Sequence, residues 1–424
     1  MGRDETLYWW GQSTSALGSV FTAVALPIMA VVYLHATPGQ IAVISASSIV
    51  PALLLGLPAG ALADRIARPR RTLILLDTVS ALAVAAVAVG LATHTATLAW
   101  LAALGLIDGA VTVLIEVVYF LHLRQLVSTD GLGPARARLQ AGQYGAGFAG
   151  RLLVGPVIVL FGPAAALAVD VVSYLVSVMA LMSMRPIADA TPGHSPAAKE
   201  HPLSGLTAGA RYFLADRFHR ILLAMIVVPV VAGSGAGVLI APFLLRVVRV
   251  PTSVYGLVFA VGGLAGLAGS AVAARWFTPD RDPRRIVTLT FAATVVCGLP
   301  VPLALGPLPV AMGCVALGMA LPAFFGAIAN VALGPVIVGD APEHIVGRVV
   351  AMLQVLAGAG GLAGTFLGGW LGDSIGVRTA MWTLGGTAAV FVLLALPMAL
   401  SSDRRAPDTE AAVNGDSVLA RTTG

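Results

Sequence analysis

Five ionisable side chains stand inside long apolar stretches of this sequence. They are Asp77, Asp108, Glu116, Arg151 and Asp170, and all lie in the first half of the chain. An ionisable group at membrane depth carries a free-energy cost, so it indicates either a functional site or a buried polar contact. A carboxyl group in an apolar cavity binds its proton more tightly than in water, which makes such acids candidates for exchanging a proton with another ligand.

Asp108, Glu116 and Arg151 are the candidates for this exchange. Asp108 and Arg151 each lie about ten residues from an end of their apolar stretch, so both are expected near mid-depth and are predicted to form an ion pair. Glu116 follows Asp108 by two helical turns, about 12 Å along the axis and about 80° around it. The spacing predicts that both acids share one cavity wall. A purely structural role for each of the three stays open.

Asp77 and Asp170 are predicted to support structure. For Asp170 we expect hydrogen bonds to nearby backbone or to Tyr174.

The stretches that hold these residues are long enough to cross a membrane. The chain is 58% hydrophobic and 11% charged, with a mean hydropathy of +0.92, whereas a soluble domain has about 25% charged residues. A membrane-spanning helix needs about 20 apolar residues. Twelve spans are predicted, near 11–33, 41–63, 72–93, 98–120, 141–161, 163–183, 220–244, 254–275, 285–304, 309–333, 350–371 and 378–400.

The basic residues predict the orientation. Of the 25 Arg and Lys residues, 21 fall in the N-terminus, in the loops after even-numbered spans or in the tail. This asymmetry predicts a plasma-membrane protein with both termini in the cytoplasm, and it explains the basic charge without nucleic-acid binding. The N-terminus shows no cleavage site, so an uncleaved first span is expected.

The predicted organisation is two six-helix bundles, 1–184 and 220–400. A linker, 185–219, separates them and is expected to contain a helix along the membrane surface. A disordered tail, 401–424, is expected to follow.

The two halves resemble each other at an offset of 210 residues. The pairs are Gly56 and Gly266, Arg65 and Arg275, Arg138 and Arg348, and Gly162 and Gly372. Internal repeats of apolar spans are typical of transporters whose site lies between the repeats.

A loop between the second and third spans resembles a family signature. It reads Gly60-Ala61-Leu62-Ala63-Asp64-Arg65-Ile66-Ala67-Arg68-Pro69-Arg70-Arg71. The loop resembles the signature of the major facilitator superfamily, in which Gly60, Asp64, Arg65, Arg68 and Arg71 would control gating. Ala67 and Pro69 depart from the family pattern. The resemblance implies an all-helical membrane fold of twelve helices in two pseudo-symmetric bundles around a central cavity.

Further segments resemble the macrolide-efflux-like branch, which includes siderophore exporters. Among them are Val24-Ala25-Leu26-Pro27, Leu123-Arg124-Gln125-Leu126-Val127 and Gly347-Arg348-Val349. Many members carry Asp where Ser19 stands. Gly150 and Gly155-Pro156 in the fifth span resemble the antiporter signature of exporters, although packing by glycine without any bearing on direction is the alternative.

We therefore expect a secondary transporter that exports a hydrophobic or amphiphilic small molecule, such as an antibiotic or secondary metabolite, in exchange for protons. A siderophore or lipid-like substrate is the alternative, and a receptor or membrane enzyme is the alternative of a different class. The lipid bilayer is the expected surrounding, and a monomer is expected. No enzymatic activity, cofactor or metal is expected, since no His/Asp/Glu spacing suits a metal and Cys297 and Cys314 read as small apolar residues.

Overall fold

Long helices make up most of the chain that the structure describes. The computed structural model describes residues 2–56, 66, 68–127, 132–185, 202–276, 282–340 and 345–402. In the first half the elements are α1 (Arg3–Ile28), the π-helical turn η1 (Met29–Tyr33), α2 (Pro38–Gly56), α4 (Pro69–Ala92), α5 (Leu98–Leu126), α6 (Leu132–Phe161) and α7 (Pro163–Ser183). They are followed by α8 (Pro202–Ala215), α9 (Arg217–Pro242), the π-helical turn η3 (Phe243–Val247), α10 (Thr252–Trp276), α11 (Pro283–Val296), α12 (Leu308–Asp340), α13 (Val346–Ile375) and α14 (Val377–Ser402).

Eleven of the described helices are long and apolar enough to cross a membrane. The predicted span 285–304 differs, because α11 is helical over only 14 residues and ends at Val296. Pro300 and Pro302 follow, and proline cannot donate the backbone hydrogen bond that a helix needs. The chain continues as hydrogen-bonded turns in which Val301 and Ala304 are buried. The ninth element therefore keeps its place in the assembly with a shorter helix.

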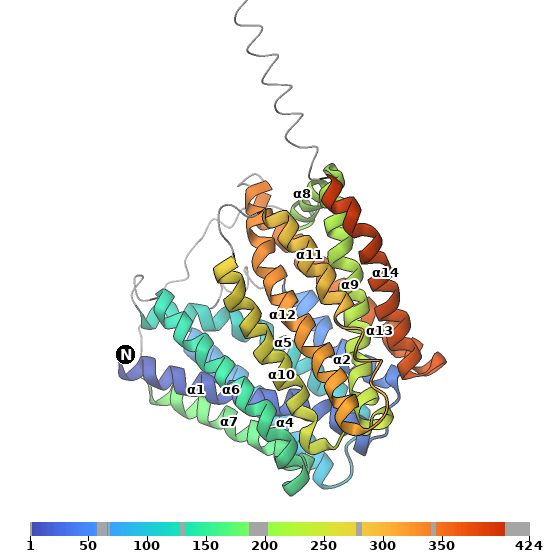
Figure 1. Ribbon diagram of the computed structural model, residues 1–424. Helices are drawn as coiled ribbons and strands as arrows, with labels where there is room; N and C mark the ends of the chain where they lie inside the picture. The colour runs from blue at the N-terminus through green and yellow to red at the C-terminus, as the bar shows by residue number, and fades with distance from the viewer. Residues whose placement is uncertain are drawn as a thin grey trace, which may run out of the picture.

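Each half packs mainly on itself. In the first half α1 packs on α6 and α7, α4 on α5 and α7, and α2 on α5, while α9, α13 and α14 pack together in the second half, as do α10, α11 and α12. The halves meet where the second helix of one packs on the fifth helix of the other, as α2 on α13 and α6 on α10. Figure 1 shows the two groups of helices inclined to one another.

Because the spans alternate in direction, the molecule has two distinct ends. We call the end that holds Gly2 and the close of α14 the terminal end. The opposite end, with the turns at 34–37, 93–97, 248–251 and 376, is called the short-turn end.

The halves are hydrogen-bonded at the short-turn end. Asp373, near the end of α13, accepts from the backbone N–H of Gly39 at 3.1 Å and from the hydroxyl of Thr37 at 3.3 Å. Arg246 donates to the carbonyl oxygen of Val31 at 2.8 Å. The hydrogen bonds that join described residues of the two halves all lie here. The two groups of helices come together at this end and separate towards the terminal end (Figure 1).

The backbone repeats at an offset of 214 residues. Both π-helical turns, the left-handed residues His35 and Arg249, and the left-handed glycines Gly162 and Gly376 are related by this offset. The predicted match of Gly162 with Gly372 is wrong, because Gly372 lies inside α13 and the turn that matches Gly162 is at Gly376. Glycine is frequent in this chain, so a chance match four residues from the true one gives an offset of 210 instead of 214 residues.

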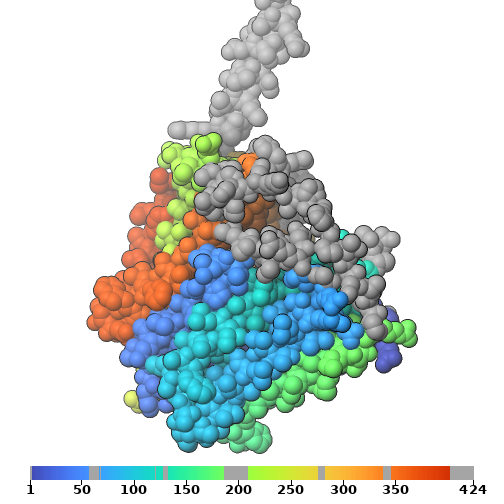
Figure 2. Space-filling model, turned by 180° about the vertical axis from the view of Figure 1, so that it is seen from behind, coloured from blue at the N-terminus to red at the C-terminus, as the bar shows by residue number. Residues whose placement is uncertain are grey.

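One long face of the first half is covered by apolar side chains. Figure 2 shows α2, α5, α4 and α7 side by side on this face. On α4, Leu75, Val79, Leu82 and Val89 are exposed at helical spacing, whereas the opposite side of the same helix is buried against α5 and α7. A helix that is apolar on its outer side suits a lipid surrounding.

Candidate functional site

The first half encloses a cavity of about 770 Å³ that contains the predicted acids. Its wall is formed by α1, α5 and α6, with Tyr174 contributed by α7. Asp108 and Glu116 both line it from α5, Glu116 as an exposed side chain and Asp108 as a half-buried one. The structure thus brings these two acids together in one wall, while their role in proton exchange stays a prediction.

Two glycines set the rotation of α5. A Cβ added at Gly105 or Gly109 would overlap Ser47 or the backbone of Ser48 on α2. Glycines one turn apart let two helices approach closely, so this side of α5 is held against α2. Asp108 lies on a different side of the helix, where it reaches the cavity.

The predicted ion pair between Asp108 and Arg151 is not present, although the structure describes both residues. Arg151 lines a different cavity, of about 250 Å³, between the two halves. The reason lies in the helix packing: α5 packs on α2 and α4, whereas α6 packs on α1 and α10. Equal depth in the membrane therefore did not bring the two side chains together.

Asp170 and Asp77 are buried and hydrogen-bonded, with 1% and 2% of their surfaces exposed. The hydroxyl of Thr22 on α1 donates to Asp170, and Ser173 donates to the same carboxyl at 3.2 Å. Ser177 donates to Asp77 at 2.7 Å and thereby joins α7 to α4. These contacts favour a structural role for both acids, which the sequence predicts.

Neither expected partner of the Asp170 carboxyl, nearby backbone or Tyr174, bonds to it among the described residues; Thr22 and Ser173 do. The hydroxyl of Tyr174 lies 3.2 Å from that of Ser19, and both residues line the larger cavity. Sequence reasoning missed Thr22 as the partner of Asp170. A signal was present, since Ser15, Ser19 and Thr22 recur at helical spacing in an otherwise apolar stretch.

The larger cavity has polar lining residues that sequence reasoning did not select. Tyr119, Arg136, Gln140 and Gln143 lie towards the terminal end of α5 and α6. On helices that carry charged loops, such residues are hard to separate from ordinary surface positions. They make the part of the cavity wall between the two acids and the terminal end polar.

Most of the signature loop lies outside the described residues, including Gly60, Asp64 and Arg65. Arg68 precedes α4 and Arg71 lies in its first turn, so Pro69 occupies the first helical position, which proline suits. Arg70, in the same loop, donates to the carbonyl oxygens of Leu181 and Met182 at 2.7 and 2.9 Å. It satisfies the C-terminal end of α7, where a cation is favourable.

The glycines of the fifth span pack α6 on two neighbours. A Cβ at Gly150 would lie 3.1 Å from the carbonyl oxygen of Leu17 on α1, and one at Gly155 would lie 2.8 Å from that of Thr252 on α10. Pro156 follows within the helix. Gly155 therefore takes part in the contact between the halves.

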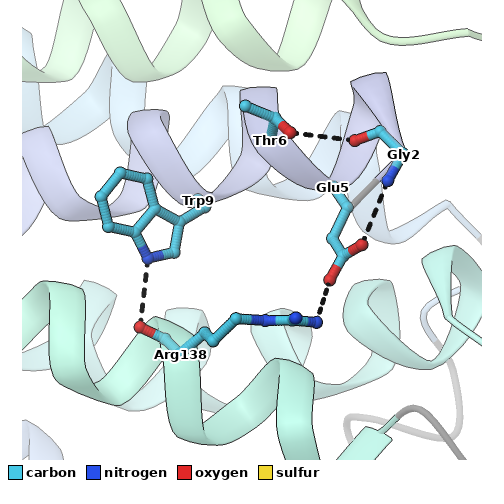
Figure 3. A network of polar contacts seen from close by, with 5 residues as sticks. All are labelled: Gly2, Glu5, Thr6, Trp9 and Arg138. Atoms are coloured by element: carbon cyan, nitrogen blue, oxygen red, sulfur yellow. Dashed lines mark hydrogen bonds and ion pairs between the residues drawn. The ribbon is translucent and has the colours of Figure 1, made fainter.

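At the terminal end, α1 and α6 are also tied by polar contacts. Arg138 on α6 forms an ion pair with Glu5 on α1 at 2.7 Å, and Trp9 donates to the carbonyl oxygen of Arg138 at 3.1 Å (Figure 3). These contacts hold together two of the helices that form the cavity wall.

Comparisons with known proteins give a consistent result. A family model described as transmembrane secretion effector matches residues 6–418. The multidrug efflux pump Tap of Mycolicibacterium fortuitum is 28% identical over 405 residues, which cover 91% of each chain.

Solved structures resemble the fold. The nucleoside transporter NupG matches with a TM-score of 0.73 at 12% identity, over 94% of this chain and 99% of that one. A bacterial homologue of the iron transporter ferroportin in an inward-facing state matches with a TM-score of 0.66 at 17% identity, over 93% and 98%. At these identities the likeness concerns the fold alone.

Proposed function

Since the chain belongs to the transmembrane secretion effector family of the major facilitator superfamily, we propose that it exports a hydrophobic or amphiphilic small molecule in exchange for protons. Family membership makes it a multi-pass secondary transporter and not an enzyme, as the signature loop predicts. The exported substrate, the coupling ion and the orientation belong to the proposal.

The observation that carries the proposal is the pair of carboxyl groups in one cavity wall. Asp108 and Glu116 face a space large enough for a drug-sized molecule. A proton on either acid and a cationic group of the substrate would compete for the same negative charge. Competition of this kind couples the outward movement of one ligand to the inward movement of the other.

The arrangement of the halves supports alternating access. With the terminal end in the cytoplasm, as the basic loops favour, the hydrogen bonds at the short-turn end close the outer side. The substrate would enter from the cytoplasm, and release would require the contacts of Asp373 and Arg246 to break. A plasma-membrane location and a monomer are part of this proposal.

The relative Tap is a multidrug efflux pump by name, which supports export of foreign or secondary metabolites here. Rhodamine 123 is a suitable amphiphilic probe, together with its free acid, rhodamine 110. In everted vesicles from a host without its own efflux pumps, we expect energised uptake of at least one dye and its collapse by a proton ionophore. Uptake of neither dye, or uptake that the ionophore leaves unchanged, would contradict proton-coupled export.

Substitutions test which residues couple transport to protons. Asp108→Asn and Glu116→Gln are expected to lower energised uptake by about tenfold or more, since each replaces a carboxyl group of the cavity wall by an amide that cannot ionise. Asp77→Asn is the matched control: it makes the same chemical change on a buried acid outside the cavity, and its amide oxygen can still accept from Ser177. Expression levels of all three should equal that of the wild type.

A further inference from the structure

The smaller cavity, of about 250 Å³, lies where the two halves meet. Helices α1, α2 and α6 of the first half and α9 and α10 of the second contribute to its wall. Most of its lining is apolar, and the polar side chains in it are Arg151, Ser45 and Tyr255. A cavity lined by both halves changes shape when the halves move relative to one another. Binding of a ligand there therefore depends on the stage of the transport cycle.

Arg151 brings a permanent positive charge into this cavity. A guanidinium group stays protonated in proteins and has donors only. The side chain lies about 15 Å from the end of α6, well inside the apolar region. Among the described residues it forms no ion pair, so the cost of holding the charge at this depth is not offset by a carboxylate of the described part of the chain.

The guanidinium group is positioned by close packing of two helices. A Cβ added at Gly256 on α10 would overlap the carbonyl oxygen of Arg151. Cβ atoms at Gly147 and Gly263 would lie 3.4 and 3.8 Å from its Nη1. The side chain therefore lies between α6 and α10, along two glycine surfaces, instead of extending to either end of the membrane.

Tyr255 also lines this cavity. Its side chain is 1% exposed, and its hydroxyl is buried without a hydrogen-bond partner among the described residues. Buried hydroxyl groups normally have a partner. Arg151 and Tyr255 both line this cavity, and an unpaired cation and an unpaired hydroxyl group can each donate to an oxyanion.

We propose that this cavity binds an acidic group of the exported molecule, so that the substrate is an amphiphile with both an acidic and a basic group. Val20 and Ala23 line both cavities, so the two cavities adjoin, and in this proposal one molecule extends from Arg151 towards Asp108 and Glu116. The acidic group contacts Arg151 and Tyr255, and the basic group competes with protons at the two acids. This inference rests on the proposed function and adds the substrate class.

Two dyes with the same body test the inference. Rhodamine 110 carries a free carboxylate and a cationic ring system, and rhodamine 123 is its methyl ester, which keeps only the cation. Binding to the purified full-length protein in detergent is measured by fluorescence polarisation at neutral pH. We expect the wild type to bind rhodamine 110 about tenfold or more tightly than rhodamine 123, as a charge-assisted contact predicts.

Substitutions distinguish this contact from non-specific binding of the dyes. Arg151→Gln is expected to bind both dyes equally, Arg151→Lys to keep part of the preference, and Tyr255→Phe, which removes one oxygen atom, to reduce it about threefold. The absence of a preference in the wild type overturns the proposal, as does a preference that survives in Arg151→Gln. Should Arg151→Gln fail to fold, an unchanged preference in Tyr255→Phe overturns it.

The binding assay uses no proton gradient, so its outcome is independent of the transport test. Ionophore-sensitive uptake of rhodamine 123 together with equal binding of the two dyes would leave proton-coupled export standing and remove the acidic-group site. A strong preference for rhodamine 110 without energised uptake of either dye would support the acidic-group site and contradict proton-coupled export.

Discussion

The embedded acids fall into two kinds according to their contacts. Asp77 and Asp170 are fully buried and accept hydrogen bonds from serine or threonine hydroxyls. Asp108 and Glu116 instead line a cavity that a ligand can enter. The same residue type is therefore buried in hydrogen-bonded contacts at one pair of positions and lines a cavity at the other.

This division predicts different effects on stability. Asp170→Ala removes the acceptor of Thr22 and Ser173 between α1 and α7, and we expect it to lower the free energy of unfolding by about 1–3 kcal/mol. Asp108→Ala, on the cavity wall, should cost less. Thermal unfolding of the two variants in detergent makes the comparison, and a larger loss for Asp108→Ala would be inconsistent with the division.

At the residue scale, the sequence could predict how deep a side chain lies in the membrane but not which neighbouring helix it faces. Helical periodicity places Asp108 and Glu116 two turns apart, and both do lie in one wall. It says nothing of which neighbour a helix faces, and the predicted pair of Arg151 with Asp108 does not form, because α6 faces α1 and α10. The hydroxyl partner of Asp170 likewise depends on helix packing, which no spacing within α7 records.

Among the helices, α6 makes the most informative contacts, because it touches both halves. A Cβ at Gly155 would overlap the carbonyl oxygen of Ser253 on α10, whereas one at Gly145, on the same helix, meets nothing within 4 Å. We expect Gly155→Ala to destabilise the protein by about 1–3 kcal/mol and to slow transport, since it separates α6 from α10.

Gly145→Ala is the matched control for this change. It adds the same methyl group to the same helix and should leave both stability and energised uptake close to wild type. Equal effects of the two substitutions on thermal unfolding would show that glycine content, and not the contact between the halves, is what matters in α6.

The elements themselves were largely predictable, with two informative exceptions. Apolar length alone located the spans, but α11 ends early because Pro300 and Pro302 interrupt its hydrogen bonding. Residue types match at an offset of 210 residues, whereas the backbone repeats at 214. Left-handed residues such as His35 and Arg249 mark the true register, and residue type does not reveal them.

At the scale of the whole molecule, the contacts at the short-turn end join the two halves, and in the proposed function they close the outer side. Asp373→Ala removes the acceptor of Thr37 and Gly39. A net loss of about 1 kcal/mol would shift the balance of the two states about fivefold towards the outward-open one.

Labelling of the cavity mouth measures this shift. In a background with Cys297 and Cys314 replaced by serine, Gln140→Cys places a thiol at the cavity wall. We expect a maleimide on the cytoplasmic side to label it several-fold more slowly when Asp373→Ala is added. Ser374→Ala is the control, because Ser374 bonds within its own helix; a faster reaction in Asp373→Ala would contradict the proposed closure.

The duplicated helical fold could be predicted from the sequence because composition, spans and loop charges all point to it. Which side of the molecule is closed could not be predicted, since it depends on contacts between residues more than 200 positions apart, such as Val31 with Arg246 and Gly39 with Asp373. The unequal chemistry of the halves was visible in the sequence, as every embedded charge lies in the first half.

The central claim is that substrate and protons compete at Asp108 and Glu116. The most direct measurement is proton release when rhodamine 110 is added to the purified protein in weakly buffered detergent, followed by a pH-sensitive dye. The account predicts release from the wild type that saturates with the binding of rhodamine 110 and is abolished in the double variant Asp108→Asn, Glu116→Gln. Binding without proton release, or equal release from the double variant, would contradict it.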